Sequence, residues 1–272
     1  MSTTAVVVGV STMDSRPAVR WAAEEAVARK AELRLVTATH EGQAPRGVTA
    51  GWMLASEAAA CWPGLTVTTD IATGPPAVVL RAAAADADLL VVGGDDASPF
   101  MEALSGSVPG ELMTTTPCSL AVVPRREWTT PAPTPVVVGL DEATTARPAL
   151  SYAFATAARA GRPVTVMCCG LAPAVPHALI AFGEVCPDVS VTVEKAVGNP
   201  EALLTTASRA AGLLVLGSRS RLVSWVFGSV SRNLIRRGYC PVVIARDRPV
   251  TTVPAPRDSR DDQPDPHTEH CP

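Results

Sequence analysis

The sequence predicts an α/β protein made of two tandem doubly wound domains, each with a five-stranded parallel sheet. Two observations carry this prediction: the chain repeats itself once, and each copy alternates short apolar segments with helical patterns. Near-continuous apolar strands are typical of parallel sheets, which helices cover on both faces. A length of 272 residues is that expected of two domains.

The repeat consists of similar blocks that follow one another in the same order in both copies. AVVVG at Ala5 resembles PVVVG at Pro135, and the later pairs are TGPP with VGNP, LLVVGG with LLVLGS, GSV with GSV, and PCSLAVV with YCPVVIA. The repeat places a first domain at residues 1–128, a Pro-rich linker at 129–134 and a second domain at 135–246. The charged, Pro-rich tail at 247–272 cannot bury a core, so we expect it to be disordered.

The pattern of apolar runs assigns the secondary structure of each copy. In the first copy we expect strands at Ala5–Val10, Glu32–Thr37, Thr66–Ile71, Leu89–Gly93 and Ser119–Val123, and helices at Arg16–Lys30, Val48–Cys61, Pro76–Ala85 and Ser107–Thr114. In the second copy we expect strands at Pro135–Leu140, Pro163–Cys168, Val189–Ala196, Leu213–Leu216 and Pro241–Ala245. Such a unit is doubly wound and binds ligands where the strand order reverses, at the carboxyl ends of its first and fourth strands.

The composition excludes several classes of function. A net charge of −3 and only 4% aromatic residues argue against nucleic acid and anionic membranes as partners. We find neither a signal peptide nor an apolar run long enough to cross a membrane, so the expected location is the cytoplasm. Seven cysteines without a C-x-x-C spacing are typical of buried thiols in a reducing compartment. His267, His270 and Cys271 lack a fourth ligand, so no metal site is predicted.

The segment Leu213–Val230 has the pattern of a strand, a basic loop and a helix start. Its apolar run ends at Gly217, and Gly228 and Ser229 precede an amphipathic stretch. The first N–H groups of a helix have no intrahelical partner, and together with the helix dipole they favour an anion such as phosphate. An altered copy of this segment lies at Leu89–Val108.

These blocks resemble the universal stress protein family in its tandem two-domain form, with an adenine nucleotide alpha hydrolase-like fold. The resemblance rests on VVVGLD at the start of a unit and on the G-x-P turn after the third strand. The family signature against which the chain is compared is G-x2-G-x9-G-[ST], in the last loop of a unit, after the fourth strand. It implies that this last loop wraps the triphosphate of ATP. It also implies that an Asp after the first strand contacts the nucleoside.

The first copy departs from that signature in its charge. It keeps the spacing from Gly93 to Gly106, but Asp96 replaces the second glycine beside Asp95, and Ser11 stands where the resemblance expects the nucleoside-contacting Asp. Each carboxylate at ~4 Å from a phosphate costs about 1 to 4 kcal/mol. We therefore expect no ATP in this copy. The two aspartates are solvated, hold Mg²⁺, or contact the other copy.

The second copy keeps more of the signature, although its loop is two residues shorter and Ser220 replaces the second glycine. The predicted nucleotide-binding residues are Asp141, Cys169, Gly217, Arg219, Ser220, Gly228, Ser229, Val230 and Ser231. Two alternatives remain open. Arg219 either neutralises phosphate or belongs to a solvated loop, and Cys169 either lines the adenine pocket or is a small core residue.

The residues and the resemblance together predict a cytoplasmic, non-enzymatic stress-response protein that senses ATP or another adenine nucleotide through its second domain. The alternative is a nucleotide-free adaptor that acts by protein contacts. No catalytic residue is predicted, since no G-x-S-x-G motif or positioned base is found. The last strands, Leu120–Val123 and Val242–Ala245, are sheet edges that need cover. The resemblance implies that they pair within the chain as a pseudo-dimer. A homodimer of the whole chain and an unidentified signalling partner are further expectations.

Overall fold

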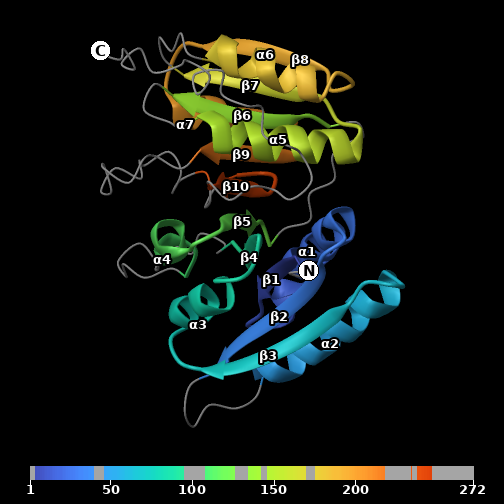
Figure 1. Ribbon diagram of the computed structural model, residues 1–272. Helices are drawn as coiled ribbons and strands as arrows, with labels where there is room; N and C mark the ends of the chain where they lie inside the picture. Colours follow the sequence, from blue (N-terminus) through green and yellow to red (C-terminus); the bar gives the residue numbers. More distant parts are fainter. Residues whose placement is uncertain are drawn as a thin grey trace, which may run out of the picture.

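The computed structural model describes residues 4–39, 46–94, 108–125, 134–141, 146–169, 175–217, 234 and 238–246 (Figure 1). The predicted disordered tail and nearly all of the predicted linker lie outside these ranges. The strands are β1 (Ala5–Gly9), β2 (Glu32–Thr39), β3 (Val67–Thr73), β4 (Leu89–Gly93), β5 (Ser119–Val123), β6 (Val136–Asp141), β7 (Val164–Cys169), β8 (Val191–Ala196), β9 (Leu213–Gly217) and β10 (Val242–Ala245). Each predicted strand is therefore confirmed, with small shifts at the ends.

The helices follow the expected alternation with the strands. They are α1 (Arg16–Arg29), α2 (Arg46–Cys61), α3 (Pro76–Ala83), α4 (Val108–Thr115), α5 (Ala146–Ala160), α6 (Val175–Val185) and α7 (Pro200–Ala207). A short 3-10 turn, η1 (Met13–Ser15), precedes α1 and was not predicted. The four helices expected in the first copy are confirmed to within two residues at each end.

All ten strands belong to one sheet, in the order β3-β2-β1-β4-β5-β10-β9-β6-β7-β8. Within the first half (β1 to β5) and within the second half (β6 to β10), every neighbouring pair is parallel. Each half thus has the doubly wound order that the sequence predicts. The strand order reverses around β1 and around β6, so each half has one switch point.

The two halves join through the last strand of each. β10 pairs with β5 in antiparallel register, with Val243 opposite Ala121 and Ile244 opposite Leu120. This pairing confirms the predicted cover for the two edges. It leaves β3 and β8 at the ends of the sheet, and most of β3 is exposed.

The turns before α3 and α7 explain the repeated G-x-P pattern. Gly74 and Gly198 have φ angles of +144° and +136°, which glycine adopts far more readily than residues with a side chain. Pro76 and Pro200 then begin the helices, where a missing N–H costs nothing in hydrogen bonding. The same turn therefore directs the chain from the third strand of each half into the following helix.

The hydrophobic core is continuous on one face of the sheet and divided on the other. One cluster of buried residues contains side chains of α1 and α2 from the first half and of α5 and α6 from the second half. On the opposite face, side chains of α3 and α4 form one cluster, and Leu204 of α7 belongs to another. Packing on the α1/α5 face therefore connects the halves independently of the β5–β10 ladder.

Candidate functional site

The switch point of the second half brings three of the predicted site residues to one edge of the sheet. β6 lies between β9 and β7, and its last residue, Asp141, is the register partner of Cys169. Gly217 ends β9, directly after Leu216, which pairs with Gly139 of β6. Because the three strands are parallel, their carboxyl ends meet at this edge, where doubly wound sheets bind ligands.

The remaining residues of the predicted site lie outside the described residues. These are Arg219, Ser220 and the helix start Gly228–Ser231. Of Asp141 and Cys169 the structure describes only the backbone, whereas Gly217 is fully described and partly buried. The roles assigned to these residues therefore stay predictions. The aspartates Asp95 and Asp96 of the first half also lie outside the described residues.

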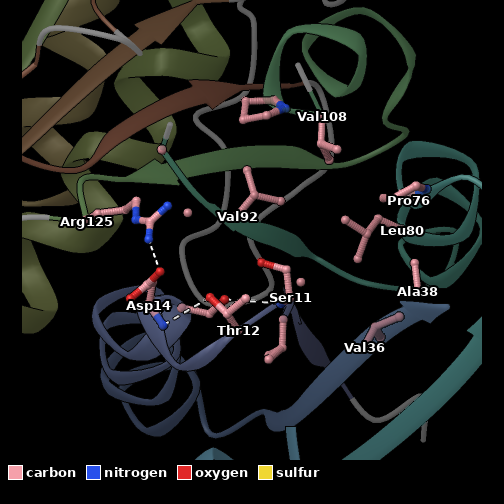
Figure 2. A pocket seen from close by; sticks show the side chains of 16 residues that line it. Ser11, Thr12, Asp14, Val36, Ala38, Pro76, Leu80, Val92, Val108 and Arg125 are labelled. Atoms are coloured by element: carbon pink, nitrogen blue, oxygen red, sulfur yellow. Dashed lines mark hydrogen bonds and ion pairs between the residues drawn. The ribbon is translucent and has the colours of Figure 1, made fainter. Parts of the chain in front are cut away.

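The switch point of the first half opens into a crevice of about 290 Å³. It lies at the carboxyl ends of β1 and β4, and helices α3 and α4 begin at its wall (Figure 2). Val36, Leu80 and Val92 supply buried apolar surface, while Asp14 and Arg125 supply the charges. We call this cavity the first-half crevice.

The turn η1 uses its own polar groups to hold its shape. Thr12 caps the turn by accepting a hydrogen bond from the backbone N–H of Asp14 at 3.2 Å. Ser15 accepts a hydrogen bond from the backbone N–H of Ser11, also at 3.2 Å. These donors are therefore already engaged. Such local capping is typical of Ser and Thr beside helix starts.

An ion pair between Asp14 and Arg125 lies at the wall of the first-half crevice (Figure 2). Asp14 belongs to η1, and Arg125 follows β5, so residues 111 positions apart in the sequence meet there. Both side chains keep contact with solvent. The two charges cancel, so the described part of the crevice wall carries no net charge.

The helix starts at this crevice are poor in hydrogen-bond donors. Pro109 is the second residue of α4, and Pro76 is the first residue of α3; both line the crevice. Proline has no backbone N–H, so each removes one of the donors that a helix start offers to an anion. In the second copy, Ser231 occupies the position that corresponds to Pro109. The structure therefore adds a reason to expect no phosphate in the first half.

A second polar cluster, which the sequence did not predict, lies between the halves. The Glu25 carboxylate accepts hydrogen bonds from Arg29 at 3.0 and 2.7 Å and lies 4.0 Å from Arg159 of α5. The Arg29 guanidinium lies over the ring of Tyr152, 5.0 Å from its centroid. Burial raises the pKa of the Tyr152 phenol above its ordinary value. Glu25 and Arg29 are four residues apart on a predicted helix, and this spacing is the sequence pattern that could have indicated their ion pair.

We find no cluster of three or more histidine, cysteine or acidic residues with metal-binding geometry in the described ranges. The same ranges contain no helix long and apolar enough to span a membrane. Of the described cysteines, Cys61 is exposed, whereas Cys118, Cys168, Cys186 and Cys240 are buried. Burial raises the pKa of the Cys240 thiol to about 12, which makes it a poor nucleophile.

The comparison with protein families identifies the fold and the repeat. The model of the universal stress protein family matches residues 3–124 and 178–246, which together make up more than half of the chain. The chain belongs to the universal stress protein family. Both switch points and the β5–β10 joint are therefore features of a universal stress protein with two units in one chain.

Two universal stress proteins of Mycobacterium tuberculosis match most of the chain. The universal stress protein Rv2005c of Mycobacterium tuberculosis is 26% identical over 284 residues, which cover 89% of this chain and 96% of the relative. Universal stress protein Rv2623 of the same organism is 27% identical over 290 residues, covering 90% of this chain and 97% of the relative. The similarity thus extends across both halves.

Solved structures share the architecture at lower identity. A universal stress protein from Archaeoglobus fulgidus superposes with a TM-score of 0.69 at 17% identity, covering 89% of this chain and 96% of that chain. A universal stress protein from Pseudomonas aeruginosa gives a TM-score of 0.61 at 17% identity, covering 90% and 93%. These structural similarities support the assignment of the fold.

Proposed function

We propose that this universal stress protein is a non-enzymatic stress-response protein that binds ATP or another adenine nucleotide in its second half. The observation that carries the proposal is the meeting of Asp141, Cys169 and Gly217 at the β9–β6–β7 switch point. Ligands of doubly wound sheets bind at this place. The family resemblance assigns Asp141 and Gly217 to the nucleotide, and Cys169 is assigned to the adenine pocket by its position at the end of the second strand of the unit.

Each part of the site has a chemical role in this proposal. The backbone N–H groups of the helix start at Ser229 meet the phosphates, and Arg219 and Ser220 add a positive charge and a hydroxyl. Asp141 accepts hydrogen bonds from the nucleoside, and Cys169 lies beside the base. Phosphoryl transfer needs a positioned base or water-orienting group, and usually a metal. Neither is found by spacing around the loop, which supports binding without turnover.

The proposed consequence of binding is a change in a surface that a signalling partner reads. A phosphate at Ser229 contacts the loop that follows Gly217, and a partner protein in the cytoplasm distinguishes the loop with nucleotide from the loop without it. A homodimer of the chain is a further part of the proposal, since the ends of its sheet, β3 and β8, are unpaired among the described residues.

The second candidate function is that of a nucleotide-free adaptor. The first-half crevice supports it, because among the described residues Arg125 is paired with Asp14 and Pro109 offers no backbone N–H to a phosphate. The shortened loop of the second half points in the same direction. An adaptor of this kind acts through protein contacts alone.

The experiment that separates the two functions is a nucleotide titration with matched variants. Calorimetry with ATP and AMP on the full chain is expected to show one site, which Ser229→Glu abolishes and the corresponding change Ser107→Glu in the first half leaves intact. The protein is also denatured and filtered after purification, and the filtrate is analysed for bound nucleotide. Absence of nucleotide in both measurements supports the adaptor. Tight ATP binding that survives Ser229→Glu and Asp141→Ala rejects the assigned site.

A further inference from the structure

The first-half crevice has a charged side and an apolar side. Figure 2 shows the ion pair of Asp14 and Arg125 on one side and Val36, Leu80 and Pro76 on the other. We propose that this crevice binds a zwitterionic α-amino acid with an apolar side chain. The proposal does not depend on nucleotide binding in the second half.

The ion pair favours a ligand that carries both charges. The ammonium group of an amino acid pairs with Asp14, and its carboxylate pairs with Arg125, whose guanidinium has the fork geometry that carboxylates accept. The ligand carboxylate thus replaces Asp14 beside Arg125, and the ligand ammonium replaces Arg125 beside Asp14. A ligand with a single charge satisfies only one member of the pair and faces a like charge on the other. The crevice therefore discriminates between ligands by the number of charges that they carry as well as by their size.

Phosphate-bearing ligands are disfavoured by the same wall. The N–H groups of Ser11 and Asp14 are already bonded within η1, and Pro109 has none to offer. Among the described residues of this wall, an anion thus finds few free backbone donors.

The apolar side selects the side chain of the ligand. Val36, Leu80 and Val92 are 2%, 5% and 3% exposed, so the wall is fixed by packing in the core. A cavity of about 290 Å³ admits a branched aliphatic side chain. A charged side chain would lose its hydration there without gaining a partner. Leucine is the probe that fits both sides of the crevice.

The test is calorimetric titration of the full chain with L-leucine and two analogues that each lack one charge. These are 3-methylbutylamine, without the carboxylate, and 4-methylpentanoate, without the ammonium group; each is expected to bind at least about tenfold more weakly. Asp14→Asn and Arg125→Gln are each expected to reduce leucine affinity by at least about tenfold. Both side chains are solvent-accessible, so the fold is retained, as a thermal unfolding curve checks.

The matched control is Arg16→Gln. It removes the ion pair of Arg16 with Glu57, which is similarly exposed but lies outside the crevice lining, and is expected to leave leucine affinity unchanged. The proposal is wrong if leucine does not bind at millimolar concentration, or if both analogues bind as well as leucine. It is also wrong if Ser229→Glu protein still binds ATP and Asp14→Asn abolishes that binding, since the crevice then takes anions.

Discussion

Replacing Glu25 by alanine is expected to destabilise the whole chain strongly, because it leaves a buried charge without its partner. The side chain of Arg29 is only 3% exposed, and Glu25 supplies its carboxylate at 2.7 Å. Removing one member of a buried ion pair costs about 3 to 5 kcal/mol. Part of the cost is offset here, since Arg29 also lies over the Tyr152 ring. We therefore expect a loss of about 3 kcal/mol in the free energy of unfolding.

Urea unfolding measures this loss, and the neighbouring glutamate provides the control. Glu24 pairs with Arg20 at 3.5 Å on the surface, with side chains 53% and 74% exposed, so Glu24→Ala is expected to cost less than about 1 kcal/mol. Glu25→Ala should lower the urea midpoint by about 1 M. Equal midpoints for the two variants would refute the assignment of a buried ion pair. The Glu25→Ala/Arg29→Met double variant is expected to recover part of the loss.

Three further predictions concern other parts of the molecule. Burial raises the pKa of Tyr152, so at high pH the native state keeps the phenol proton longer than the unfolded state does, and the free energy of unfolding falls above about pH 10. This fall should be smaller in Tyr152→Phe. If urea titrations gave both proteins the same pH profile, the buried phenol would not be its cause. Val243→Pro interrupts β10, which is paired on both sides, and should lower the free energy of unfolding by about 3 kcal/mol or more. Val193→Pro lies in β8, at the end of the sheet, and should cost less. Thermal melts of the two variants measure the difference. Iodoacetamide should label Cys61 before Cys240 in the native protein; mass spectrometry showing equal rates would rule out the described burial.

The strands and their order were predictable because they depend on local patterns and on the internal repeat. Apolar runs such as Leu89–Gly93 are buried on both faces and leave a clear signal. The joint between β5 and β10 was predictable from the family resemblance and from the need to cover two apolar edges. The boundaries of β2 and β8 shifted by two residues, because strand ends are set by pairing partners that the local pattern does not reveal.

The charged contacts were not predictable, because they join residues that are distant in the sequence. Asp14 and Arg125 meet only once β5 has been placed beside β4. The cluster around Glu25 and Tyr152 requires helices of both halves to pack on the same face. Asp14 comes three residues after Ser11, the position of the expected nucleoside contact, but no pattern in the sequence indicates that Arg125 is its partner. The loop after Gly217, on which the nucleotide hypothesis depends, lies outside the described residues and stays a prediction.

The antiparallel joint between β5 and β10 has a consequence for how far the two switch points can differ in sequence. In a dimer of identical subunits, a single gene encodes both sites, so every substitution appears in each of them. Here the two units are encoded separately, and the chain itself supplies both strands of the joint. Pro109 therefore stands in the first unit, while the corresponding position of the second unit is Ser231. Covalent linkage thus allows the two units to carry different residues at corresponding positions, which two copies of one gene product cannot do.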